Sequence, residues 1–137
     1  MKVAIVGSRL FTGPVAYDWI IDAVRASGFE VEELVSGGAD GIDSAAEQWA
    51  NIHHLPKKIF LPLWKRNGRQ AGFIRNHQIV EYADAVIAIW DMKSRGTRST
   101  IELTIAAGKP IKVFAPGLPS DDEGLLEVED INEILSD

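Results

Sequence analysis

Short apolar runs alternate with longer amphipathic stretches along this 137-residue chain. Each run has the length of one buried strand, and the stretches between runs place apolar residues at helical spacing. This alternation is typical of βαβ units, in which helices connect the parallel strands of a single sheet. The five runs lie at residues 3–7, 31–36, 58–61, 85–90 and 111–114.

The intervening stretches predict helices and one loop. Right-handed crossovers place such helices on both faces of the sheet. We therefore predict an α/β fold, a Rossmann-like three-layer αβα sandwich around a mostly parallel five-stranded sheet. The expected helices span residues 14–27, 42–53, 73–82, 98–107 and 131–135, with a polar, basic loop at 63–72 and a turn at 117–120.

Several classes of protein are excluded or disfavoured by composition. The chain has no cysteine, which excludes disulfides, Cys-ligated zinc and thiol nucleophiles and agrees with a cytoplasmic location. The first apolar run is far too short for a signal-peptide core or a membrane span, so we expect no membrane association. The histidines have no partners at metal-ligand spacing, so we expect no metal and no other cofactor.

The net charge of −6 is unevenly distributed along the chain. Residues 120–137 hold eight acidic residues and no lysine or arginine, which leaves the first 119 residues with a net charge of +2. Between Lys65 and Arg98 there are seven basic and three acidic residues. A locally positive middle of this kind favours phosphate groups.

Glycine and polar residues follow the first four runs, at the point where each strand is expected to end. Ligands of open parallel sheets bind outside the carboxyl ends of the strands, so these residues predict one shared binding cleft. In chain order they are Gly7-Ser8-Arg9, then Ser36-Gly37-Gly38-Ala39-Asp40-Gly41 with Asp43, then Trp64, and finally Trp90-Asp91 with Ser94-Arg95-Gly96-Thr97.

The segment from Ser36 to Asp43 has three glycines within five residues. Glycines let a backbone turn with positive φ and approach a ligand closely. The following helix directs its free N–H groups and positive dipole end toward an anion placed there. The alternative is that Asp40 or Asp43 caps this helix.

A second turn of the same type is Arg95-Gly96-Thr97. Its amides and the Thr97 hydroxyl can hold a phosphate, or Thr97 can cap the next helix while Arg95 lies in solvent. Arg9 can bind a ligand or form a salt bridge with its neighbours.

Arg75, followed by Asn76, opens another helix and can pair with a phosphate through two parallel hydrogen bonds, or it is a surface arginine. Trp64 and Trp90 stand at strand ends, where each can stack on a base or belong to the core.

Taken together in this order, these motifs resemble those of the SLOG superfamily. The resemblance is greatest to its YspA or cpYpsA-related branch and covers about residues 2–115. It implies a Rossmann-like nucleotide-binding domain that often self-associates, so we expect a homo-oligomer. Relatives include the LOG phosphoribohydrolases and the Rossmann part of DprA. By resemblance, Gly37, Gly38 and Gly96-Thr97 form the nucleotide and phosphate loops, and Arg75 matches an arginine that acts in the LOG enzymes.

One position departs from the LOG pattern PGGxGTxxE. Thr100 stands where the glutamate is expected, and the nearest carboxylate, Glu102, falls two residues later. Two helical residues turn a side chain to nearly the opposite face, so Glu102 is a poor substitute. Asp40, Asp43 or Asp91 can supply a carboxylate instead.

We therefore predict that the chain binds a nucleotide or nucleotide-derived ligand through phosphate, as a sensor or processing domain. Residues 1–116 would form this domain, with residues 117–137 as an acidic tail of the same domain. One alternative is a nucleoside-monophosphate phosphoribohydrolase, an N-glycosidase with Arg75 and Asp43 as catalytic residues. Another is single-stranded nucleic-acid binding, which the acidic tail disfavours.

Overall fold

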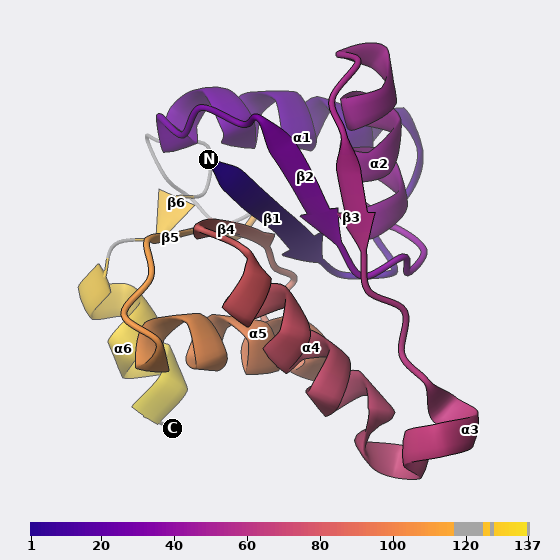
Figure 1. The fold of residues 1–137 in the computed structure, drawn as a ribbon. Helices are drawn as coiled ribbons and strands as arrows, with labels where there is room; N and C mark the ends of the chain where they lie inside the picture. Colours follow the sequence, from indigo (N-terminus) through magenta and orange to yellow (C-terminus); the bar gives the residue numbers. More distant parts are fainter. Residues whose placement is uncertain (117–124, 127, 137) are drawn as a thin grey trace.

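The computed structural model describes residues 1–116, 125–126 and 128–136, which form a six-stranded sheet between two layers of helices (Figure 1). The strand order is β3-β2-β1-β4-β5-β6; the first five strands pair in parallel and β6 is antiparallel to β5. The predicted α/β sandwich is confirmed, with one strand more than expected. The strands are β1 (Lys2–Gly7), β2 (Glu33–Ser36), β3 (Lys57–Ile59), β4 (Ala85–Ile89), β5 (Ile111–Phe114) and β6 (Leu125–Leu126).

The helices divide between the two faces of the sheet (Figure 1). Helices α1 (Gly13–Ser27) and α2 (Ile42–Ile52) cover one face. Helices α4 (Ala71–Tyr82), α5 (Arg95–Ala106) and α6 (Val128–Ser136) cover the other. In the part of the chain that the structure describes, no helix has the length and apolar character that a membrane span needs.

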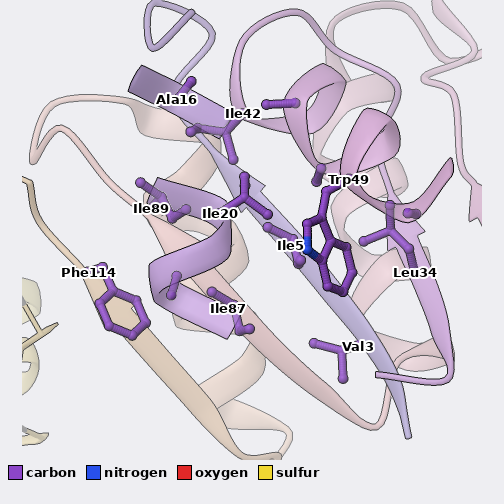
Figure 2. Packing of buried hydrophobic residues seen from close by; sticks show 14 of the residues in the cluster. Val3, Ile5, Ala16, Ile20, Leu34, Ile42, Trp49, Ile87, Ile89 and Phe114 are labelled. Carbon is purple, nitrogen blue, oxygen red and sulfur yellow. The ribbon is translucent and has the colours of Figure 1, made fainter. Parts of the chain in front are cut away.

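Alternate residues of the central strands supply two hydrophobic clusters, one on each face. Ile5 and Ile87 face the α1–α2 layer, where they meet Ile20, Ile42 and Trp49 (Figure 2). Their strand neighbours face the α4–α5 layer. Every residue of β4 is buried, because this strand lies between β1 and β5 and is covered on both faces. This burial explains why residues 85–90 are the most apolar run.

Several expected elements differ in the structure, among them the last helix, which begins at Val128 rather than at residue 131. The predicted loop at 63–72 contains helix α3 (Trp64–Asn67) and a 3₁₀ turn, η1 (Gly68–Gln70). Helix α5 begins at Arg95, three residues before the predicted start. Strand β3 ends at Ile59, so Trp64 follows it at a distance and lies in α3. The predicted turn at 117–120 lies outside the described residues.

The described part of the acidic tail packs on the α5 side of the sheet. Ile131 of α6 is buried in the second cluster, and Arg98 of α5 donates a hydrogen bond to the Leu135 carbonyl at 3.0 Å. Helix α6 therefore lies near β5, at the edge of the sheet opposite β3 (Figure 1).

Candidate functional site

A cleft of about 1300 Å³ opens at the carboxyl ends of the strands. Its walls come from the segments after β1, β2 and β4 and from the first turns of α2, α4 and α5. Sixteen of the nineteen predicted ligand-binding residues line it: Gly7, Ser8, Arg9, Gly37, Gly38, Ala39, Asp40, Asp43, Trp64, Arg75, Asn76, Asp91, Ser94, Arg95, Gly96 and Thr97.

The other three, Ser36, Gly41 and Trp90, support the cleft from outside it. The buried Ser36 hydroxyl donates to Glu47 Oε2 at 2.7 Å and accepts the Gly38 N–H at 3.2 Å. A Cβ at Gly41 would lie 2.5 Å from the Ser8 carbonyl oxygen, so this glycine permits close packing of two loops. Both residues shape the turn behind the cleft.

Of the two alternatives for Trp90, stacking on a base or a place in the core, the structure supports the core. Its side chain is only 2% exposed and belongs to the cluster under α4 and α5. The indole Nε1 donates to the Ser94 carbonyl at 3.1 Å, so Trp90 positions the start of α5 from below.

The turn at Gly37-Gly38 has no room for larger residues. Gly38 has φ of 70°, and a Cβ there would lie 2.5 Å from Leu61 Cδ2. A Cβ at Gly37 would lie 2.5 Å from Arg75 Nη1 and 2.9 Å from Asp43 Oδ2. Gly37 is thus buried between a guanidinium and a carboxylate, and Gly38 beside it is exposed.

Arg75 ties this turn to α4 and α5. Its Nη1 donates to the Gly37 carbonyl at 2.6 Å, and its Nε donates to Asn76 Oδ1 at 3.0 Å. Asn76 in turn donates to the Gly96 carbonyl at 3.3 Å. Arg75 is half-buried rather than a surface side chain. Burial lowers the pKa of the Arg75 guanidinium from its usual value, and the Asp43 carboxylate opposes that shift.

Asp43 is a buried carboxylate, 6% exposed. Burial raises its pKa from 3.8 to about 6, against the opposing effects of the Ala39 N–H, 3.2 Å from Oδ2, and of Arg75. Helix α2 has Gly41 at its N-cap with no side-chain cap, so the alternative in which Asp40 or Asp43 caps it does not occur. Among the described residues, no ion pair closer than 4.0 Å joins Arg75 to Asp43.

Arg95-Gly96-Thr97 forms the first turn of α5 rather than a turn before it. Ser94 is the N-cap, since its Oγ accepts the Thr97 N–H at 3.4 Å, so the alternative in which Thr97 caps the helix does not occur. The first N–H groups of a helix have no intrahelical partner. Arg95 and Gly96, whose N–H groups belong to this first turn, both line the cleft.

The structure separates the three candidate carboxylates. Asp40 is exposed. Asp91 accepts the Lys93 and Ser94 N–H groups at 2.9 and 2.7 Å and the Ser8 hydroxyl at 3.0 Å. Partial burial would raise the pKa of Asp91, but these donors together hold it below the usual value. Asp43 alone of the three combines deep burial with a raised pKa.

Thr100, which stands where the LOG pattern has a glutamate, brings no carboxylate to the cleft. Thr100 is buried, and its hydroxyl donates to the Gly96 carbonyl at 3.2 Å. Glu102 is exposed and pairs with Arg98 at 3.2 Å, on the face of α5 away from the cleft. The helical argument from the sequence about Glu102 agrees with this placement.

Sequence reasoning missed several lining residues. Phe73 and Arg69 line the cleft beside Trp64, and Lys93 joins Arg9 and Arg95 as exposed cations in its wall. Phe73 could have been predicted, because it stands two residues before Arg75 at the start of the same helix. Arg69 belongs to the unexpected η1, whereas Lys93 lies after β4 between the predicted residues Asp91 and Ser94.

Comparison with known proteins finds similarity to a phage protein and to a solved structure. No protein-family model matches the chain. The Gene 61 protein of Mycobacterium phage D29 is 29% identical over 120 residues, covering 82% of this chain and 95% of that protein. The X-ray structure of DNA processing protein A (DprA) from Streptococcus pneumoniae superposes with a TM-score of 0.67 at 22% identity.

The chain resembles DprA in fold. The match covers 98% of this chain but 56% of the DprA chain, so the chain spans little more than half of that protein. This likeness confirms the predicted Rossmann-like fold class. At this level of identity it carries no residue roles across.

Proposed function

We propose that this chain binds a nucleotide or a nucleotide-derived ligand, with a ligand phosphate at the Gly37-Gly38 turn. The observation that carries the proposal is the half-buried Arg75 guanidinium, held on that turn and linked through Asn76 to the start of α5. A guanidinium beside exposed backbone and a helix start is a good environment for phosphate oxygens.

The motifs support the same proposal. Membership of the SLOG superfamily, in its YspA or cpYpsA-related branch, would account for Gly37-Gly38 and Gly96-Thr97 facing one cleft. The homo-oligomer that this resemblance implies belongs to the proposal and is tested by sedimentation.

Isothermal titration calorimetry with AMP, NAD, ADP-ribose and cyclic nucleotides tests the binding. Loss of a charge-assisted contact costs about 1.5–3 kcal/mol, so Arg75→Gln should weaken binding by about ten- to a hundredfold. Arg25→Gln is the matched control, because Arg25 is exposed in the last turn of α1, outside the cleft. Absence of binding across the panel, or equal loss in both variants, would contradict the proposal.

A second candidate function is cleavage of an N-glycosidic bond, and the environment of Asp43 favours it. A carboxyl with a pKa of about 6 can exchange a proton near neutral pH, and Arg75 stands across Gly37 from it. Release of free base from AMP, IMP, GMP or CMP over hours is the assay. Asp43→Asn should abolish release, and an unchanged rate would exclude this candidate.

Single-stranded nucleic acid remains a proposed alternative ligand for the same cleft. DprA is named as a DNA processing protein, and Lys65, Arg66 and Arg69 of α3 and η1 add positive charge beside the cleft. Phosphate contacts make such binding fall steeply with salt. A gel shift that shows no complex at low salt would remove this alternative.

A further inference from the structure

One wall of the cleft is aromatic and exposed. Trp64 of α3 and Phe73 of α4 both line the cleft, and they are 58% and 54% exposed. Large aromatic side chains usually lose most of their exposed surface when a chain folds. Two of them left open in one cleft, which we call the aromatic wall, indicate a surface available to a ligand.

The fold holds these rings in place. A Cβ at Gly72 would lie 3.6 Å from Trp64 Cη2, so the indole rests against the backbone at the start of α4. Phe73 packs edge-to-face on His77, with ring centroids 5.6 Å apart. Figure 1 shows α3 standing beyond the start of α4, outside the sheet, and Trp64 of α3 lines the cleft.

The aromatic wall lies next to the proposed phosphate position. Gly72, Arg75 and Asn76 share one face of α4, since residues three and four apart are neighbours on a helix. Gly72 and Arg75 are about 4.5 Å apart along the helix axis at 1.5 Å per residue. The cleft is therefore cationic at Arg75 and aromatic one helical turn away.

We propose that the aromatic wall binds the nucleobase of a nucleotide whose phosphate lies at the Gly37-Gly38 turn. This inference rests on the proposed function and adds that base and phosphate are recognised together. Stacking on Trp64 accepts any base, because every base offers a π-face. The same unit, a base joined to a phosphate, can come from a free nucleotide or from a single strand.

Comparing AMP with ribose 5-phosphate, which lacks the base, isolates the contribution of the aromatic wall. The wild-type protein should bind AMP about tenfold more tightly than ribose 5-phosphate. Trp64→Ser should remove that preference and leave the affinity for ribose 5-phosphate unchanged. Leu63→Ser is the matched control, because Leu63 is 51% exposed and adjacent to Trp64 but does not line the cleft.

Fluorescence reports the stacking directly. AMP, but not ribose 5-phosphate, should quench tryptophan emission in the wild-type protein, and the quenching should disappear in Trp64→Phe. A ten-nucleotide deoxyadenosine strand distinguishes the two sources. If the strand binds more tightly than AMP and its affinity falls steeply with salt, the ligand is a single strand. If the strand binds more weakly than AMP, the ligand is the free nucleotide. In either case Trp64→Ser must lower the affinity for the ligand.

Three results would overturn the inference, and each has a different consequence. Equal binding of AMP and ribose 5-phosphate, with no effect of Trp64→Ser, would remove the base site and leave phosphate binding intact. Failure of the wild-type protein to bind either compound or the strand would remove the proposed function as well. A change in sedimentation but not in AMP affinity for Trp64→Ser would assign the aromatic wall to self-association instead.

Discussion

Replacing Asp43 with asparagine is expected to stabilise the protein at pH 8 and to change its stability little at pH 4. Burial raises the pKa of this carboxyl from 3.8 to about 6. Each unit of difference between the folded and unfolded chain is worth about 1.36 kcal/mol, so ionised Asp43 costs the folded state about 3 kcal/mol. Asparagine carries no charge and can still accept the Ala39 N–H.

The direction of the pH dependence follows from the raised pKa. Below pH 3.8 the carboxyl is neutral in both states, and its cost is absent. As pH rises toward 6, the unfolded chain loses its proton first and the wild-type protein loses stability. Above that pH the full cost is present, so the advantage of Asp43→Asn should reach about 3 kcal/mol at pH 8 and fall below about 1 kcal/mol at pH 4.

Urea unfolding at pH 4, 6 and 8 measures this difference, with Asp18→Asn as the control. Asp18 is exposed on α1, so its substitution removes no buried charge. A difference between Asp43→Asn and wild type that stays constant with pH would refute the reasoning. Destabilisation by Asp43→Asn at pH 8 would refute it too, because Arg75 would then hold Asp43 in its charged form.

Three further substitutions test the supports of the fold. Lys109→Met should cost about 2 kcal/mol in urea unfolding, because Nζ donates to three backbone carbonyls at the end of α4 at 2.6–2.9 Å. Ser94→Ala should lower the free energy of unfolding by about 1 kcal/mol, measured by thermal denaturation, since the Thr97 N–H loses its cap. Trp90→Phe should cost about 2 kcal/mol through lost packing and the lost bond to Ser94, while quenching of Trp64 by AMP persists.

The fold was predictable because its elements are long enough to show their period. A fully buried strand is apolar throughout, so residues 85–90 predict a strand from their composition alone. In the structure this strand ends at Ile89, one residue earlier. Helix α3 has four residues and β6 has two, and both are too short to show a repeating pattern of apolar residues. Pairing of β6 with β5 also depends on tertiary contacts that a local pattern does not contain.

The start of α5 illustrates a local ambiguity that only packing resolves. Ser94 and Thr97 are both good N-cap residues, so the sequence permits either start. In the structure the Trp90 indole binds the Ser94 carbonyl and Asp91 binds the Ser94 N–H. These two contacts from residues three and four positions earlier place Ser94 at the cap.

The position of the cleft was predictable from the strand ends, but its electrostatics were not. Asp40, Asp43 and Asp91 are equivalent in the sequence, and the structure buries Asp43, exposes Asp40 and surrounds Asp91 with donors. Burial arises from residues distant in the chain. Arg75 contacts the Gly37 turn across 38 positions, which no local motif reveals.

The most direct test of phosphate binding in this cleft is an NMR titration that follows the glycine amides as AMP is added. The account predicts that the resonances of Gly37, Gly38 and Gly96 shift in a saturable manner. Gly28 and Gly108, which follow the ends of α1 and α5 and lie outside the cleft, should not move. Unchanged spectra, or shifts confined to Gly28 and Gly108, would contradict the account.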